Sequence, residues 1–483
     1  MKENTTNAKI VATIGPASRS YEMIRDIIKS GARVIRLNFS HGNHEEHQQT
    51  VDWARQASEE LDTPIAIFQD LQGPKIRVGK LDVESFQVNT GEFLKITTEP
   101  CVGNRDLISI DYPYLHEEVE KGNRILIDDG LIALKVSKIE GNVIITEVVD
   151  GGTVKPRKGV NLPETFLKHL SSYTKKDEKD LDFAFRNELD FVALSFVRSA
   201  QDVIALKKFM YKNYGREIPV ISKIEKPEAV NDITNIIAES NVIMVARGDL
   251  GVETSPEEVP VIQKMLIREC NLAGLPVITA TQMLESMITN PRPTRAEAAD
   301  VANAILDGTS AVMLSGETAA GNFPLRSVEI MNRIITHTEE SLTYQRLVLD
   351  QRLNQEDIEI NRKKSTTEAV GMATRELAME IKAAYITCFT HSGGSARLIS
   401  KFRPAVPIIA YSPFKQTVQR LALSWGVTPI LIPTLSSLDE LFEIAPRYLE
   451  TIGYIKPGDK IVITAGVPVG SPGRTNMIKV VEI

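Results

Sequence analysis

Cysteine is scarce in this sequence: Cys101, Cys270 and Cys388 are scattered over 483 residues. Their spacing fits neither a disulfide framework nor a metal-binding motif, so we interpret them as small apolar residues in a protein of a reducing compartment. A run of about 18 apolar residues is also missing, which argues against a membrane-spanning helix. The polar N-terminus lacks the apolar core of a secretory signal. The sequence therefore predicts a cytoplasmic protein without a membrane partner.

The sequence also lacks a strong net charge. The formal charge is −7, with 56 basic and 63 acidic residues interspersed, so we expect no nucleic-acid partner. The Walker A pattern is missing, which counts against a P-loop nucleotide-binding fold. What the chain does have is a 42% share of hydrophobic residues over 483 positions. That is enough for a large core divided among two to four domains.

Short apolar runs of strand length alternate with helical patterns in two stretches of the chain. There are eight such runs, at residues 9–13, 34–37, 65–68, 191–194, 220–222, 242–245, 277–279 and 311–314. Eight strands that alternate with helices predict a closed (β/α)8 TIM barrel, formed by residues 1–74 and 171–343. In such a barrel, the reactive residues lie on the loops that follow the strands.

The rest of the chain predicts two further domains. Residues 75–170 show short alternating β patterns with Gly-rich turns, which indicates an inserted β-barrel domain that can cover the strand ends as a lid. A charged connector at 354–364 belongs to the last part, residues 344–483. Apolar runs at 384–387, 406–410, 428–432 and 460–464 predict a C-terminal α/β domain with an open sheet.

Two acids and a lysine follow consecutive predicted barrel strands. Lys223 and Glu225 end one strand, and Asp249 follows the next. Neighbouring parallel strands are only about 4.8 Å apart, so both carboxylates can reach one cation. Proteins usually hold Mg²⁺ with one or two carboxylates and a substrate phosphate. Phosphoryl transfer is therefore the leading hypothesis, and structural ion pairs at the barrel rim are the alternative.

The segment around Asp249 is rich in glycine. Gly248 and Gly251 predict an opened backbone whose N–H groups can approach a ligand carboxylate. Residues 254–257 have the composition of a helix N-terminal cap, so we expect the next helix to begin there.

Three histidines after the second predicted strand suggest a zinc site: His41, His44 and His47. Asn43 and Glu46, however, have the spacing of a capping box, in which the two side chains bond each other's backbone N–H. We therefore interpret the segment as the start of a solvated helix and not as a metal site.

Other polar residues at strand ends are open to two interpretations. The Thr281 hydroxyl can pass a proton through water, or it can be satisfied by the backbone. Gly73-Pro74 can be a simple hinge where the chain leaves the barrel.

Thr294 and Glu297 form a second capping-box pattern, which predicts a helix start. The remaining candidates are Arg36, Asn38, Ser40, Asp70, Lys75, Arg77, Ser195, Arg247, Ser315 and Glu317.

A loop in the C-terminal domain combines hydroxyls and glycines between a predicted strand and a predicted helix at 396–402. Its residues are Thr390, His391, Ser392, Gly393, Gly394 and Ser395. Such a loop is typical of a phosphate-binding nest, although a plain turn has a similar composition.

Taken together, these motifs make the chain resemble the pyruvate kinase family over essentially its whole length. The matching segments are 36–42, 70–77, 158–163, 222–225, 244–253, 280–286 and 313–319. The resemblance implies the final step of glycolysis, in which phosphoenolpyruvate and ADP become pyruvate and ATP. It also implies that Glu225 and Asp249 hold Mg²⁺, or Mn²⁺ in its place.

The resemblance implies further roles for residues of this chain. The substrate carboxylate would rest on the backbone of Ala246, Arg247, Gly248 and Asp249, and beside Thr281. Lys223 and Arg36 would neutralise the charge of the moving phosphoryl group. The nucleotide phosphates would face Arg36, Arg77 and Lys158. The enolate would be protonated near Thr281 and Ser315.

Regulation and assembly are also implied. A monovalent-cation site would use Asn38, Ser40, Asp70 and the Leu71 carbonyl, but Lys75 stands where potassium-dependent members have glutamate. We therefore expect turnover without potassium. The loop at 390–395 would bind a phosphorylated allosteric activator, and the protein would be a homotetramer.

Two alternative functions remain: a Mg²⁺-dependent barrel lyase or aldolase that acts on an enolate, and a non-catalytic metabolite sensor.

Overall fold

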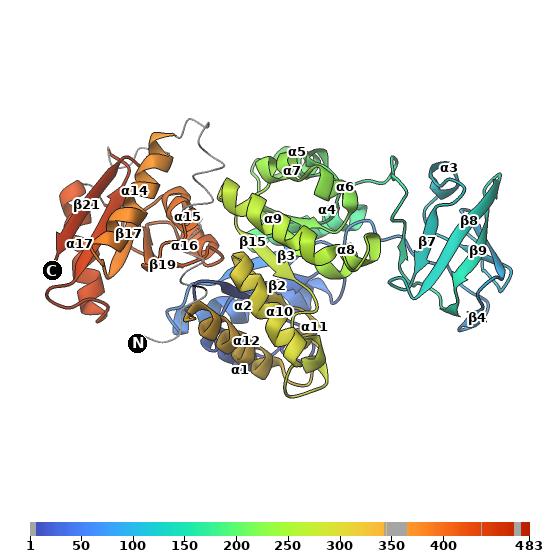
Figure 1. The fold of residues 1–483 in the computed structure, drawn as a ribbon, viewed down its shortest axis with the longest axis horizontal. Coiled ribbons are helices and arrows are strands. Elements are labelled where there is room, and N and C mark those ends of the chain that lie inside the picture. The colour runs from blue at the N-terminus through green and yellow to red at the C-terminus, as the bar shows by residue number, and fades with distance from the viewer. Residues whose placement is uncertain (1–5, 342–343, 345–364, 436, 468–474) are drawn as a thin grey trace.

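The structure is a computed structural model that describes residues 6–341, 344, 365–435, 437–467 and 475–483. It has three parts, with a barrel in the middle, a β domain at one end and the C-terminal domain at the other (Figure 1). The expected charged connector at 354–364 lies outside the described residues. Among the described helices, none combines the length and the apolar character needed to cross a membrane.

Eight parallel strands close the central barrel in the order β1-β16-β15-β14-β13-β12-β3-β2. They are β1 (Lys9–Thr13), β2 (Ala32–Asn38), β3 (Ala66–Asp70), β12 (Phe191–Val197), β13 (Val220–Ile224), β14 (Val242–Ala246), β15 (Val277–Ala280) and β16 (Ala311–Leu314). Each apolar run predicted as a barrel strand corresponds to one of them. The predicted TIM barrel is confirmed.

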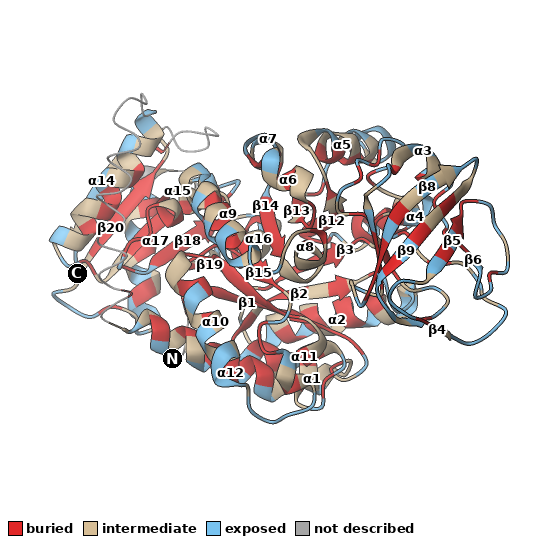
Figure 2. Ribbon diagram, turned by 45° about the vertical axis from the view of Figure 1, so that its right-hand side comes forward, coloured by how far each residue is buried: buried red, intermediate tan, exposed pale blue. Residues whose placement is uncertain are grey.

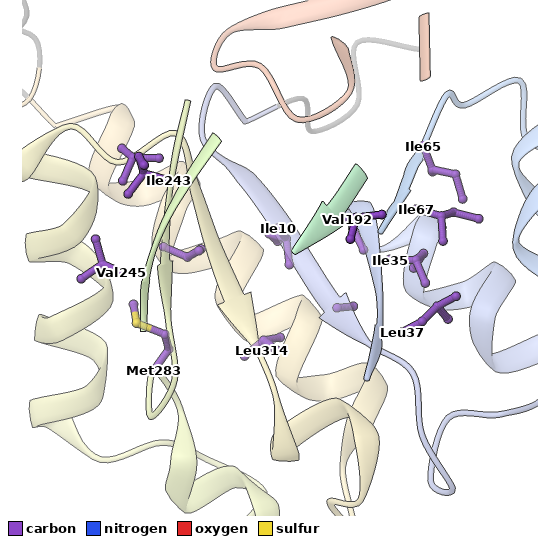
Figure 3. Packing of buried hydrophobic residues seen from close by; sticks show 14 of the residues in the cluster. Ile10, Ile35, Leu37, Ile65, Ile67, Val192, Ile243, Val245, Met283 and Leu314 are labelled. Atoms are coloured by element: carbon purple, nitrogen blue, oxygen red, sulfur yellow. The ribbon is translucent and has the colours of Figure 1, made fainter. Parts of the chain in front are cut away.

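The barrel has two apolar layers because side chains alternate along each strand. Val11, Met244 and Ile278 belong to a cluster of barrel-strand residues inside the barrel, which Ala422 and Leu423 of the C-terminal domain join. Their neighbours Ile10 and Ile243 belong to the larger cluster between the strands and the surrounding helices (Figure 3). Burial on both sides explains why these strands are continuously apolar in sequence.

The helices around the barrel pack their apolar faces on the strands and expose their outer faces (Figure 2). They are α1 (Tyr21–Lys29), α2 (His44–Glu60), α4 (Lys175–Arg186), α5 (Ala200–Tyr214), α6 (Pro227–Asn231), α7 (Ile233–Glu239), α8 (Arg247–Glu253), α9 (Val259–Ala273), the short η1 (Glu285–Ile288), α10 (Arg295–Asp307), α11 (Gly316–Ala319) and α12 (Pro324–Glu339). Both predicted capping boxes are present, at Asn43 with Glu46 and at Thr294 with Glu297.

The β domain is inserted between β3 and β12. A curled sheet of six strands has the order β11-β7-β8-β9-β5-β6, and β10 pairs with β4 beside it. The elements are β4 (Phe86–Val88), β5 (Phe93–Thr97), β6 (Leu107–Ser109), α3 (Leu115–Glu118), β7 (Arg124–Ile127), β8 (Ile132–Glu140), β9 (Val143–Asp150), β10 (Gly152–Val154) and β11 (Val160–Asn161). The domain has a buried apolar cluster of its own.

The C-terminal domain is an open α/β sheet with the strand order β19-β18-β17-β20-β21. Its elements are α14 (Thr366–Glu380), β17 (Tyr385–Phe389), α15 (Gly394–Lys401), β18 (Ile408–Ser412), α16 (Lys415–Leu421), β19 (Val427–Leu431), α17 (Leu438–Thr451), β20 (Lys460–Ala465) and β21 (Met477–Glu482). The four predicted strands correspond to β17 to β20. The edge strand β21 is antiparallel and was not predicted.

Candidate active site at the ends of the barrel strands

A network of charged side chains lies at the carboxyl ends of β2, β3 and β13, with its carboxylates buried and its cations partly buried. Two nitrogens of the Arg36 guanidinium contact Asp70 Oδ2 at 2.8 and 2.7 Å. The Lys223 ammonium lies 2.8 Å from Glu225 Oε1, 3.4 Å from Asp70 Oδ1 and 2.8 Å from the Ser195 hydroxyl. Sequence reasoning therefore placed Lys223 and Glu225 correctly beside each other, and the structure adds the link through Asp70 to Arg36.

The network shifts the pKa of each member according to its neighbours. Burial alone would lower the pKa of Lys223, but the carboxylates of Asp70 and Glu225 outweigh burial and raise it. Burial would raise the pKa of Asp70, but Lys223 and Arg36 hold it below its usual value. The pKa of Glu225 is raised, mainly by burial, with Lys223 opposing and Asp249 adding to the rise. The two acids predicted to share a cation are thus close enough to repel each other.

The segment that carries Asp249 is a helix and not the opened backbone that its glycines suggested. Helix α8 begins at Arg247 directly after β14, and the next helix, α9, begins only at Val259. The expected helix cap at 254–257 is therefore wrong, since Glu258 is the N-cap residue. Gly248 lies on the side of α8 that faces Thr281: a Cβ atom there would be 3.4 Å from Thr281 Oγ1, an ordinary van der Waals distance.

Thr281 has an unusual backbone at this point of contact. Its φ of 69° lies in the left-handed region, which is strained for a β-branched residue. The hydroxyl accepts a hydrogen bond from the Gly248 N–H at 2.8 Å and donates one to the Ala280 carbonyl at 2.6 Å. Both partners are backbone groups, as the structural interpretation of Thr281 expected. Thr281 therefore joins the start of α8 to the end of β15.

Arg247 and Ser315 lie on either side of Thr281 in the barrel order. The Arg247 guanidinium contacts Asp300 at 2.8 Å and the Thr281 carbonyl at 2.9 Å, so it braces the start of α8. The Ser315 hydroxyl is buried and has no hydrogen-bond partner among the described residues. The adjacent Glu317 accepts hydrogen bonds from the backbone N–H groups of Ser315 and Leu284, at 2.7 and 3.0 Å.

The histidines after β2 have structural partners. His44 lies 2.8 Å from Asp180, and His47 stacks on Phe39. Within the described ranges, no three side chains of the metal-binding types come together as a ligand set. The predicted helix start is confirmed, but His47 is buried against Phe39 and not solvated as expected, because α2 turns this side toward the core.

The comparisons with known proteins decide the family. The model described as "Pyruvate kinase, barrel domain" matches residues 5–328, and "Pyruvate kinase, alpha/beta domain" matches residues 368–481. The chain belongs to the pyruvate kinase family. It is accordingly a phosphotransferase enzyme. The predicted family is confirmed.

Relatives of this family match over nearly the whole chain. A pyruvate kinase of Clostridium acetobutylicum is 42% identical, with 98% of each chain covered. Another, of Geobacillus stearothermophilus, is 44% identical over 99% of this chain and 80% of its own length. A crystal structure of a pyruvate kinase from Cryptosporidium parvum, 37% identical, has a TM-score of 0.93 and covers 99% of this chain and 96% of that one.

Two residues expected at the nucleotide phosphates of a pyruvate kinase lie in the β domain. The Arg77 guanidinium donates to the Arg157 carbonyl at 3.0 Å, and Lys158 pairs with Asp128 at 2.8 Å. Both contacts are internal to the β domain. This structure therefore does not bring Arg77 or Lys158 into contact with the Lys223 network, whereas Arg36 belongs to it.

A cleft separates the β domain from the barrel. It holds about 530 Å³ of empty space, part of which is open to solvent. Asp249 lines it from the barrel and Lys75 from the segment where the chain enters the β domain. Asn161 and Glu253 also line it, and sequence reasoning assigned no role to either residue. The Asn161 amide donates a hydrogen bond to the Glu253 carboxylate. The two residues are 92 positions apart in the chain, so no local sequence pattern predicts this contact.

The residues of the family's monovalent-cation site mostly have partners within the protein. Asn38 Oδ1 accepts a hydrogen bond from the Ser40 N–H at 3.1 Å, and the Leu71 carbonyl accepts one from the Ser195 hydroxyl at 2.7 Å. Asp70 is held by Arg36. Lys75 is exposed, and a Cβ atom on Gly159 would lie 3.1 Å from its Cε.

The predicted effector loop connects β17 to α15, which begins at Gly394, two residues before the expected start. The Thr390 hydroxyl accepts a hydrogen bond from the Gly393 N–H at 2.9 Å, and Gly393 has a φ of 83° that favours glycine. The Ser395 hydroxyl lies 2.7 Å from that of Thr475. His391, Ser392 and Gly394 are exposed.

Proposed function

We propose that this chain transfers the phosphoryl group of phosphoenolpyruvate to ADP and gives pyruvate and ATP. The observation that carries the proposal is the network of Arg36, Asp70, Lys223 and Glu225 at the strand ends, with Asp249 on the helix that follows the neighbouring strand β14, in a chain of the pyruvate kinase family. Phosphoryl transfer spreads negative charge over the phosphoryl oxygens, so it needs positioned cations more than covalent chemistry.

Glu225 and Asp249 are the residues proposed to hold Mg²⁺, or Mn²⁺ in its place. The donor atoms suit a hard cation, because both are carboxylates. Glu225 Oε1 is buried and has the Lys223 ammonium 2.8 Å away. A carboxylate oxygen has more than one lone pair, so this oxygen can also accept a cation. A bound Mg²⁺ would neutralise charge on the substrate oxygens and orient them.

The chain's own side chains supply the remaining steps. Lys223 and Arg36 stabilise the charge on the phosphoryl group, since both are cations held in place by Asp70. The substrate carboxylate rests on the backbone at Ala246–Asp249, which Thr281 fixes through Gly248. Arg36, Arg77 and Lys158 face the nucleotide phosphates once the β domain moves toward the barrel. The Thr281 and Ser315 hydroxyls lie on the side where the enolate is protonated.

An assay of ATP formation from phosphoenolpyruvate and ADP tests the reaction. We expect ATP and pyruvate in equal amounts, with a requirement for Mg²⁺ or Mn²⁺. Products of carbon–carbon bond cleavage would instead indicate the lyase or aldolase alternative. Ligand binding without turnover would indicate a metabolite sensor.

Potassium independence is the second part of the proposal. Lys75 places an ammonium where potassium-dependent members have a glutamate, and this charge would take the place of the ion. We expect full turnover with sodium or Tris as the monovalent cation, and a gain of potassium activation in Lys75→Glu. A steep potassium activation curve in the unmodified enzyme would contradict it.

Regulation, assembly and location complete the proposal. A phosphorylated metabolite activates the enzyme at residues 390–395, and Ser392→Ala or Ser395→Ala should abolish activation by a panel of sugar and nucleoside monophosphates. The enzyme is also proposed to be a homotetramer and to be located in the cytoplasm. Light scattering coupled to size-exclusion chromatography measures the oligomeric state, and a monomeric mass would contradict the proposed tetramer.

A further inference from the structure

Two sets of contacts tie the β domain to the barrel wall. After β12, the Arg198 guanidinium donates to the carbonyls of Leu167 and Leu170 at 2.7 and 2.9 Å. The Asn161 amide on β11 donates a hydrogen bond to Glu253 Oε1 at the end of α8, over 2.7 Å. Within the described part of the chain, this is the only hydrogen bond between side chains that joins the strands of the β domain to the barrel. The position of the β domain is therefore linked to α8 through Glu253.

Glu253 is a buried carboxylate with two partners on one of its oxygens and none among the described residues on the other. It is 3% exposed, and the same oxygen that accepts from Asn161 also lies 2.7 Å from the ammonium of Lys226, which is itself 7% exposed. The second oxygen, Oε2, is buried and has no hydrogen-bond partner among the described residues. A buried carboxylate normally satisfies both oxygens, so Glu253 has spare capacity for a partner as the two domains move relative to each other.

The three residues of this contact reach both segments that carry the proposed metal ligands. Lys226 directly follows Glu225 in the chain. Glu253 lies four residues after Asp249 on α8, so the two acids share one face of that helix. Asp249, Glu253 and Asn161 all line the cleft between the domains. A shift of Asn161 thus acts on both carboxylate-bearing segments at once.

We propose that Glu253 is a positioning residue that couples closure of the β domain to the geometry of Glu225 and Asp249. Asn161 is its partner on the β domain, and Lys226 is its partner on the barrel. This inference rests on the proposed function for its effect on catalysis. Its structural part, the link between the β domain and α8, does not depend on the reaction.

Asn161→Ala is the most direct test, because it removes the link without leaving a buried charge unpaired. We expect amide hydrogen exchange without substrates to become faster in both β11 and α8. We also expect a 10- to 100-fold weaker apparent affinity for Mg²⁺ or a corresponding fall in kcat, the size seen when a residue that supports metal ligands is removed. The KM for ADP should change much less. Asn161→Gln, which keeps the amide donor, should recover part of the loss.

Gln87→Ala is the matched control, since Gln87 makes a hydrogen bond with Thr153 at 2.8 Å inside the β domain. It should leave exchange in α8 and the Mg²⁺ requirement unchanged. A second variant pair avoids a buried unpaired charge: Glu253→Met with Lys226→Met removes both charges together, and with them the oxygen that accepts from Asn161. Adding Asn161→Ala to that pair should have no further effect.

The outcomes separate this inference from the proposed function. If the unmodified enzyme forms no ATP, the proposed function fails, and the exchange measurements still test the link. If Asn161→Ala behaves like Gln87→Ala in both hydrogen exchange and Mg²⁺ titration, the positioning role of Glu253 is wrong.

Discussion

At the scale of the residue, the candidate site depends on charges that stabilise one another away from water. Lys223, Asp70, Glu225 and Arg36 are each at most 12% exposed in their side chains. Removing one partner of such a buried pair typically costs 3–5 kcal/mol, because the other charge is left uncompensated. The sequence predicted Lys223, Glu225 and Asp249 because each follows an apolar strand. It did not predict the link from Lys223 to Ser195 and through Asp70 to Arg36, which depends on the barrel order.

Thr281 gives a prediction at this scale. Thr281→Ala leaves the partly buried Gly248 N–H without its acceptor. We expect kcat with phosphoenolpyruvate to fall roughly tenfold or more, because the backbone proposed to hold the substrate carboxylate is no longer fixed in place. Thr281→Ser keeps the hydroxyl and should retain most of the activity. Equal losses in the two variants, measured by steady-state kinetics, would show that the hydroxyl is unimportant.

At the scale of the element, local signals gave helix starts but not every backbone path. The capping boxes at Asn43 and Thr294 were readable because their partners lie three residues away. Helix α8 was mistaken for an open loop because Gly248 and Gly251 disfavour a helix in isolation, whereas contacts from Thr281 and Asp300 fix it in the fold. Strands β4, β6, β10 and β11 have only two or three residues, too few for a sequence period.

The capping box of α10 gives a prediction at this scale. The Thr294 hydroxyl accepts a hydrogen bond from the Glu297 N–H at 3.2 Å, so Thr294→Ala should lower the free energy of unfolding by about 1 kcal/mol. Glu297 also accepts from the Ser286 N–H at 2.6 Å, beyond the helix itself. Glu297→Ala should therefore cost more than Thr294→Ala. Urea unfolding of the two variants measures this order, and the reverse order would contradict it.

At the scale of the whole molecule, the β domain and the C-terminal domain contact opposite ends of the barrel (Figure 1). The sequence predicted this division from the short alternating β patterns at 75–170 and from a charged connector that precedes a second α/β alternation. The contacts between the parts could not be predicted, because they join residues that are distant in the chain. Lys9 is an example: at the start of β1, it donates a hydrogen bond to the Val427 carbonyl of the C-terminal domain at 3.1 Å.

Lys9 gives a prediction about pH. Burial, with repulsion from Arg33 and partial compensation by Glu339, lowers its pKa from 10.5 to about 7. Above about pH 7 the folded protein therefore releases a proton that the unfolded chain still binds, so this contribution to stability rises with pH up to 10.5. The slope is at most about 1.4 kcal/mol per pH unit.

Lys9→Met removes this titration. The difference in melting temperature between Lys9→Met and the unmodified protein should favour the variant most at and below about pH 7 and shrink steadily as the pH rises toward 10.5. Calorimetry at a series of pH values measures it. A difference that stays constant with pH would show that the Lys9 pKa is not depressed by folding.

The most direct test of the central claim is the Mg²⁺ dependence of ATP formation in Glu225→Gln and Asp249→Asn. Each variant keeps the shape of the side chain and removes its negative charge. We predict that each lowers kcat by a factor of about 10² or more and raises the Mg²⁺ concentration needed for half-maximal rate, because two carboxylates share the ion. ATP formation at the original rate and with the original Mg²⁺ requirement in either variant would contradict the account.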